Sequence, residues 1–128
     1  MIYLDSSVAL AQLFGEGRSP PMALWQQPLV SSRLLEYEVW NRVHARDFGA
    51  TFGASTQTLI GQVRLMELTP PVLARASQPF PVPVRTLDAL HLATIDFIRG
   101  HGETVELASY DNRLIAAARA LGVALAQL

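Results

Sequence analysis

The 128-residue sequence has the length of one domain, enough to bury about two-thirds of the surface that its unfolded chain exposes. Half of the residues are hydrophobic and none is cysteine, which excludes disulfides and thiolate metal sites and leaves oxygen and imidazole ligands. The net charge is −1 and lysine is absent. This composition excludes a lysine-dependent phosphate loop and the overall positive field of a protein that holds nucleic acid mainly by charge.

No segment has the properties of a membrane span or a leader. The apolar runs are far shorter than the ~20 residues that a transmembrane helix requires. Asp5 interrupts the only hydrophobic stretch at the start, so we expect no signal peptide. We therefore expect a soluble, cytoplasmic protein without a membrane partner.

Short apolar segments alternate with helical patterns along the chain. Strand character is found at residues 2–4, 29–32, 105–109 and 123–125, with a possible edge strand at 67–69. Helical patterns are found at residues 8–14, 22–27, 33–46, 55–66, 72–76, 87–98 and 114–121. No repeat or linker marks a boundary. The alternation predicts a single α/β domain over residues 1–128, with three layers (α/β/α) and a central, mainly parallel sheet.

Two aspartates follow predicted strands. Asp5 comes directly after residues 2–4, and Asp111 follows residues 105–109; each lies where a helix begins. In open parallel sheets, ligands bind at the edge formed by the carboxyl ends of the strands. Both side chains are therefore candidates for a functional site, although Asp5 could equally serve as a helix N-cap and nothing more.

Two further acids lie on predicted helices. Asp88 is in the first turn of a helix that is apolar nearly all round, where a charge is costly unless it is paired. Thr86 is the expected N-cap of that helix, and compensation of the helix dipole is the simpler explanation of Asp88. Glu38 points with the apolar stripe of the helix over residues 33–46, so it needs a partner. That partner is either Arg42, one turn on, or a metal ion.

The four acids can converge at one edge of the predicted sheet. Neighbouring carboxylates repel one another, and without cations some would have to take up protons. Mg²⁺ or Mn²⁺ relieves that repulsion, because hard divalent cations prefer carboxylate oxygens and water. Such a site suits the attack of metal-activated water on a phosphodiester.

The segments that carry these acids resemble the acidic motifs of PIN-domain proteins, in particular the VapC-type toxins of bacterial toxin–antitoxin pairs. The similarity covers about residues 1–125. It is carried by Ile2-Tyr3-Leu4-Asp5-Ser6-Ser7, by Val30-Ser31-Ser32 with Glu38-Val39, by Thr86-Leu87-Asp88-Ala89-Leu90-His91-Leu92-Ala93-Thr94, and by Ser109-Tyr110-Asp111-Asn112-Arg113-Leu114. The resemblance implies a PIN-like fold, Mg²⁺- or Mn²⁺-dependent endoribonuclease activity on RNA, a homodimer, and inhibition by a cognate antitoxin protein.

The resemblance also assigns residues. The acidic quartet of the family is matched by Asp5, Glu38, Asp88 and Asp111, and hydroxyl positions near it by Ser7 and Ser109. We therefore predict Asp5 and Asp88 as the principal metal ligands, with Glu38 and Asp111 as second-tier ligands or water-orienting groups. His91 matches the family motif but has apolar neighbours and is expected to be a core residue. Asp96 is expected to be peripheral.

Arginines near the acidic segments are candidates for contact with RNA phosphates. They are Arg33, Arg42, Arg46, Arg85 and Arg113. Isolated arginines more often solvate the surface or pair with acids, so the charge pattern alone does not distinguish these roles.

The sequence is also compatible with two functions other than a metal-dependent endoribonuclease. The chain could be a weakly active or inactive PIN-like binding module that acts mainly through a protein partner, with Trp25, Trp40 and Phe52 as an exposed apolar surface. A small-molecule phosphatase with a strand-end aspartate nucleophile fits Asp5. It lacks the second acid two residues later, where this chain has Ser7.

Overall fold

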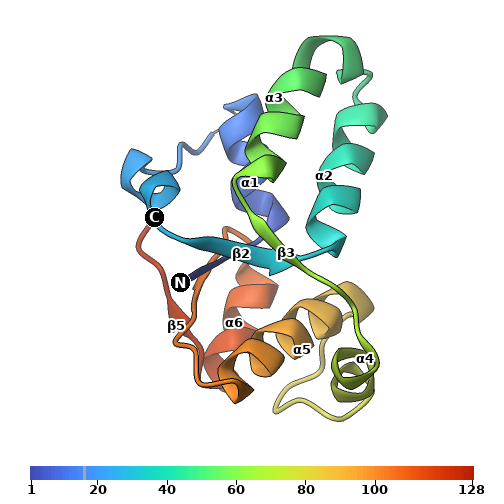
Figure 1. The fold of residues 1–128 in the computed structure, drawn as a ribbon, viewed down its shortest axis with the longest axis vertical. Coiled ribbons are helices and arrows are strands. Elements are labelled where there is room, and N and C mark those ends of the chain that lie inside the picture. Colours follow the sequence, from blue (N-terminus) through green and yellow to red (C-terminus); the bar gives the residue numbers. More distant parts are fainter. Residues whose placement is uncertain (16) are drawn as a thin grey trace.

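The computed structural model describes residues 1–15 and 17–128, and in this part of the chain a five-stranded sheet lies between two layers of helices (Figure 1). All strand pairs are parallel, in the order β3-β2-β1-β4-β5. The strands are β1 (Ile2–Leu4), β2 (Leu29–Ser32), β3 (Arg64–Met66), β4 (Glu106–Ala108) and β5 (Ala124–Leu125). The α-helices are α1 (Ser6–Phe14), α2 (Leu34–Ala45), α3 (Gly49–Gly61), α4 (Pro70–Ala76), α5 (Thr86–Gly100) and α6 (Asn112–Ala120), and Met22–Gln26 forms the 3-10 helix η1. The predicted α/β class and parallel sheet are confirmed.

The side chains of β1 alternate between two hydrophobic cores. Ile2 and Leu4 belong to the core shared with α1, α2 and α3, whereas Tyr3 belongs to the core shared with α5 and α6. Figure 1 shows α1, α2 and α3 on one side of the sheet and α4, α5 and α6 on the other. A strand that is buried on both faces is expected to be apolar at every position, which is the pattern of β1 (Ile2-Tyr3-Leu4).

The region around β3 differs from the prediction. The helix expected over residues 55–66 runs from Gly49 to Gly61, and the edge strand expected at 67–69 lies at Arg64–Met66. The stripe that ends in Val63 and Met66 fits a helix as well as a strand. Parallel pairing with β2, in which Leu65 is opposite Ser31, determines the outcome. The pairing is a long-range contact that local periodicity does not reveal.

Helix α5 is the buried helix that its composition predicts. Leu92, Ala93 and Ile95 are completely buried. The N-cap position is Arg85 rather than Thr86, and Thr86 is the first residue of the helix, so the predicted cap is wrong. Asp88 remains in the first turn, at the end of α5 that carries the positive pole of the helix dipole. In the described part of the chain no helix is long and apolar enough to cross a membrane.

Candidate active site

The topology brings the predicted acids to one edge of the sheet. β1, β2 and β4 are adjacent and parallel, so their carboxyl ends lie together. Asp5 follows β1, and its backbone N–H donates to the carbonyl of Ala108 at the end of β4 (3.0 Å). Glu38 lies on α2, which follows β2, and Asp88 lies at the start of α5. This edge is therefore the candidate site.

Asp5 is 5% exposed and is held by two hydroxyl groups. Its Oδ2 accepts hydrogen bonds from Ser7 Oγ (2.6 Å) and from Ser109 Oγ (2.8 Å). The same oxygen accepts a longer bond from the Ser7 backbone N–H (3.4 Å), so Asp5 is also the N-cap of α1. The two readings of Asp5 are therefore compatible, because one carboxylate both caps the helix and faces the edge of the sheet.

Ser7 and Ser109 fix the loop that follows β4. Ser7 Oγ accepts the N–H of Tyr110 (2.9 Å), and Ser109 Oγ accepts the N–H of Asp111 (2.9 Å). Each hydroxyl thus donates its proton to Asp5 and accepts a backbone N–H from the loop. The two serines connect the ends of β1 and β4 and hold the Asp5 carboxylate in one orientation.

The partner of Glu38 is His91, and neither Arg42 nor a metal ion is needed to satisfy it. His91 Nε2 donates to Glu38 Oε1 (2.6 Å), and the hydroxyl of Tyr3 bonds to Nδ1 of the same ring (2.8 Å). The Tyr3 oxygen also accepts the backbone N–H of Ser32 (3.1 Å). With the imidazole proton assigned to Nε2, a continuous chain of hydrogen bonds runs from β2 through the core to Glu38.

His91 is a core residue, as expected, and it has a defined structural role. It is 1% exposed. Burial acts to lower the pKa of His91, but the hydrogen bond to Glu38 and the charges of Glu38, Asp5 and Asp88 outweigh it, so the pKa is raised. Burial raises the pKa of Tyr3, which keeps its hydroxyl protonated and able to donate to His91. No sequence pattern predicts the Glu38–His91 contact, because 53 positions separate the two residues.

Asp88 and Asp111 are less constrained. Burial raises the pKa of the half-buried Asp88, and the charges of Asp111 and Asp5 raise it further. No hydrogen bond to the Asp88 carboxylate is found within the described residues. Asp111 is exposed and caps α6, its Oδ1 accepting the N–H of Arg113 (2.9 Å). The charges of Asp111 and Asp5 therefore act on Asp88 at this edge.

The donors at this edge are carboxylate and hydroxyl oxygens, which are the ligands that Mg²⁺ and Mn²⁺ prefer. Among residues 1–15 and 17–128, no three His, Asp or Glu side chains stand close enough together to form a metal-binding group. Mg²⁺ usually takes only one or two carboxylates and keeps several waters. Asp5 and Asp88 would suffice for that coordination, and the donor set fits the cation by its chemistry.

The remaining charged candidates have different surroundings. Asp96 pairs with Arg75 (2.9 Å) and Arg99 (3.6 Å), which agrees with its expected peripheral place. Arg33 binds Glu36 and Glu67 and is therefore already neutralised. Arg85 and Arg113 line a shallow pocket together with Asp88. Arg42 and Arg46 line another groove, which also contains Arg18, a residue that the sequence analysis did not single out.

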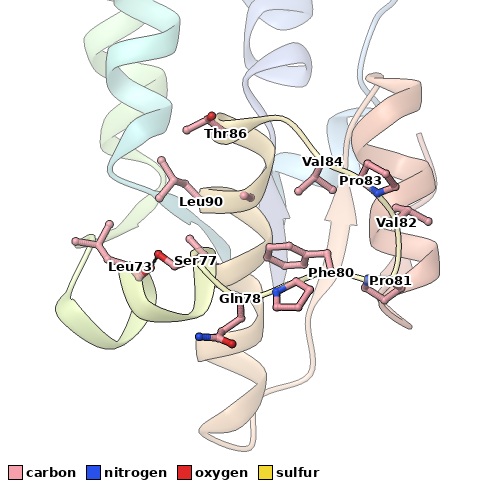
Figure 2. A pocket seen from close by; sticks show the side chains of 13 residues that line it. Leu73, Ser77, Gln78, Phe80, Pro81, Val82, Pro83, Val84, Thr86 and Leu90 are labelled. Carbon is pink, nitrogen blue, oxygen red and sulfur yellow. Dashed lines mark hydrogen bonds between the residues drawn. The ribbon is translucent and has the colours of Figure 1, made fainter.

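The largest depression near the start of α5 is not an anion site. It lies between α4, residues 78–84 and α5, and measures about 660 Å³. Figure 2 shows Phe80, residues 81–84, Thr86 and Leu90 around it. None of its lining side chains is charged. This groove, whose lining is uncharged, therefore differs in chemistry from the acidic edge.

The proposed exposed apolar surface is absent from these residues. Trp25 and Trp40 are half-buried and pack against the core, and Trp40 stacks on His44. Phe52 is half-buried and contacts the rings of Phe14 and Phe48. The expectation that these three side chains are exposed is wrong. They therefore do not form the apolar surface that favoured a binding module without catalytic activity.

Two curated relatives match almost the entire chain. Ribonuclease VapC46 of Mycobacterium tuberculosis (strain ATCC 25618 / H37Rv) is 32% identical over 126 residues, which cover 96% of this chain and 94% of the relative. Ribonuclease VapC47 of Mycobacterium tuberculosis (strain CDC 1551 / Oshkosh) is 30% identical over 134 residues, with 95% and 93% covered. No family model matches the chain, and no solved structure is a significant match.

Proposed function

We propose, from the premise that this chain belongs to the family of VapC ribonucleases, that it is a Mg²⁺- or Mn²⁺-dependent endoribonuclease. The observations that support the proposal are the place of Asp5 and Asp111 directly after two adjacent parallel strands and the raised pKa of Asp88, to which the charges of Asp111 and Asp5 contribute. Repelling carboxylates in a site of oxygen donors favour a divalent cation. The names of both relatives support RNA as the substrate.

Asp5 and Asp88 are proposed to hold the cation, and Glu38 and Asp111 to complete the site. When bound, the cation supplies an activated water and stabilises negative charge on the leaving oxygen of the phosphodiester. Ser7 and Ser109 orient Asp5 toward the edge. His91 fixes Glu38 at Oε1 and leaves Oε2 to accept a hydrogen bond from water.

The family also suggests the protein partners. We propose that the chain is the toxin of a toxin–antitoxin pair, that a cognate antitoxin protein blocks it, and that it acts as a homodimer. The net charge of −1 gives the chain no general attraction for RNA, so binding must depend on a local cluster of cations or on a second copy.

Cleavage of total cellular RNA by the purified chain tests the proposal. We expect discrete fragments with Mn²⁺ or Mg²⁺ and none with a chelator. Asp88→Asn should reduce cleavage by at least about 100-fold, the upper end of the losses seen when groups around a catalytic metal are changed. Asp96→Asn is the matched control, because it makes the same change on the same helix at a paired, peripheral carboxylate.

Two results would contradict the proposal. One is full activity of both Asp5→Asn and Asp88→Asn. The other is the absence of cleavage by a folded, antitoxin-free protein that binds no divalent cation, which would favour the partner-binding module.

A further inference from the structure

A groove of about 340 Å³ lies beside the acidic edge. Its walls come from α1, the last turn of α2, residues 17–18 and Tyr110. Arg18, Arg42 and Arg46 line it, and all three are exposed. None of the described residues that line the groove is acidic. Arg18 and Arg42 therefore place two positive charges along this groove, in a chain whose net charge is −1.

The groove shares Ser7 with the candidate active site. Ser7 and Tyr110 line it, and Ser7 Oγ is the group that donates to Asp5 and accepts the Tyr110 N–H. Arg42 follows Glu38 by four residues, so the two side chains share one face of α2 at a rise of about 6 Å. A ligand that reaches Asp5 and Glu38 therefore passes next to the groove.

Arg18 is held in place without losing its hydrogen-bond donors. Its guanidinium carbon lies 4.7 Å from the centroid of the Tyr110 ring. Stacking occupies the flat face of the guanidinium and leaves the in-plane N–H groups directed outward. Within the described residues, neither Arg18 nor Arg42 forms an ion pair, whereas Arg33 and Arg75 are bound by carboxylates.

We propose that this groove binds a phosphodiester group of the RNA strand next to the one that is cleaved, with Arg18 and Arg42 donating to the phosphate oxygens. The proposal rests on the proposed function. The guanidinium fork matches the geometry of a phosphate and binds it with charge-assisted hydrogen bonds. Because the acidic edge repels the RNA backbone, a cationic groove next to it supplies the compensating attraction. Contacts of this kind position the strand without reading its sequence.

The test measures binding separately from cleavage. The background is the Asp88→Asn protein, and the probe is a fluorescent single-stranded RNA oligonucleotide whose anisotropy is followed at several salt concentrations. We add Arg18→Gln or Arg42→Gln to this background. The matched control is Arg119→Gln, an exposed arginine in the last turn of α6, away from the site.

Each groove variant should weaken binding roughly tenfold at low salt, as expected when one charge-assisted phosphate contact is lost. The slope of log K against log[salt] should become less steep by about 0.7 for each lost contact. Arg119→Gln should leave both the affinity and the slope unchanged. Unfolding curves for all variants should coincide, because the three positions are exposed.

Unchanged affinity and slope in both groove variants would overturn the proposal, and an acidic segment of a protein partner would then be the better occupant. If wild-type protein still cleaves RNA in that case, the proposed function stands and only the groove assignment fails. If the wild type neither cleaves nor binds RNA, both proposals fail.

Discussion

The four acids form two pairs with different surroundings. Asp5 and Glu38 are bound into the core: Asp5 by two serine hydroxyls, and Glu38 by His91, which is itself held by Tyr3. Asp88 and Asp111 are bound loosely. Asp88 is half-buried with a raised pKa, and the exposed Asp111 bonds only to backbone N–H groups of its own helix in the described structure.

The two pairs are therefore expected to contribute differently to the stability of the fold and to function. The fixed acids are parts of hydrogen-bond networks that also hold β1, β2 and β4 together, so changes near them should lower the stability of the fold. The loose acids carry charges that the folded state does not neutralise. The raised pKa of Asp88 means that its charge is unfavourable in the folded state, which is common at functional sites. Substitutions that affect one pair of acids and leave the other pair unchanged test this difference.

The largest loss of stability is expected for His91→Ala. The substitution removes a fully buried ring and leaves Glu38 and the Tyr3 hydroxyl without their partner. We expect the free energy of unfolding to fall by about 3 kcal/mol, from the cavity and from the unpaired polar groups. Urea denaturation measures this, with His101→Ala at an exposed position of the same region as control. A loss no larger than that of the control would show that the network does not support the fold.

A smaller loss is expected for Tyr3→Phe, which removes only the hydroxyl. The Ser32 N–H and the His91 ring would each lose a partner in a completely buried place. We expect the free energy of unfolding to fall by about 2 kcal/mol. Tyr37→Phe is the control, because Tyr37 is 65% exposed. Equal stability of the two variants would contradict the role given to Tyr3.

Ser109→Ala tests the support of Asp5. The Asp111 N–H loses its acceptor and the Asp5 carboxylate loses one of its two hydroxyl donors. We expect a loss of about 1 kcal/mol in stability and, if Asp5 holds the proposed cation, of about 10-fold in RNA cleavage, as when a partner that orients a metal ligand is removed. Both stability and RNA cleavage are measured on the same variant. Unaltered cleavage by a destabilised Ser109→Ala protein would mean that cleavage does not require the orientation of Asp5 that Ser109 provides.

The smallest effect, with the opposite sign, is expected for Asp88→Asn in the presence of chelator. A raised pKa means that the charged carboxylate is disfavoured in the folded state, so the neutral amide should increase stability at pH 7. Because the group is half-buried and screened by solvent, the gain should be below about 1 kcal/mol. The gain should disappear as the pH falls through the folded-state pKa, since Asp88 is then protonated. Destabilisation of Asp88→Asn at pH 7 would show instead that the Asp88 carboxylate stabilises the fold, as the carboxylates of Asp5 and Glu38 are expected to do.

The sequence was sufficient for the parts of the fold that depend on local patterns. The apolar segments at residues 2–4 and 29–32 are strands, and the apolar composition around Leu92 marks a buried helix. It was insufficient around β3, where Arg64–Met66 fits a helical stripe and only pairing with β2 selects the strand.

Some features of the candidate site likewise follow from local sequence patterns, and others depend on long-range contacts. That Asp5 and Asp111 lie at strand ends follows from the alternation of strands and helices. The contact of Glu38 with His91 joins α2 to α5 through the orientation of two side chains, and no periodicity encodes it. Arg18 was missed because it lies in a turn-rich segment, and it reaches the site only through its stacking on Tyr110. The roles of the four acids in metal binding and cleavage remain predictions.

A calorimetric titration of Mn²⁺ into the metal-free protein tests directly whether this edge of the sheet is a divalent-cation site. The wild type and Asp96→Asn should bind Mn²⁺ with the same affinity, and Asp88→Asn should bind at least about 10-fold more weakly, as expected when a group that holds a metal is removed. Undiminished Mn²⁺ binding by Asp88→Asn, or no Mn²⁺ binding by the folded wild type, would contradict the proposal that Asp88 holds a divalent cation at this edge.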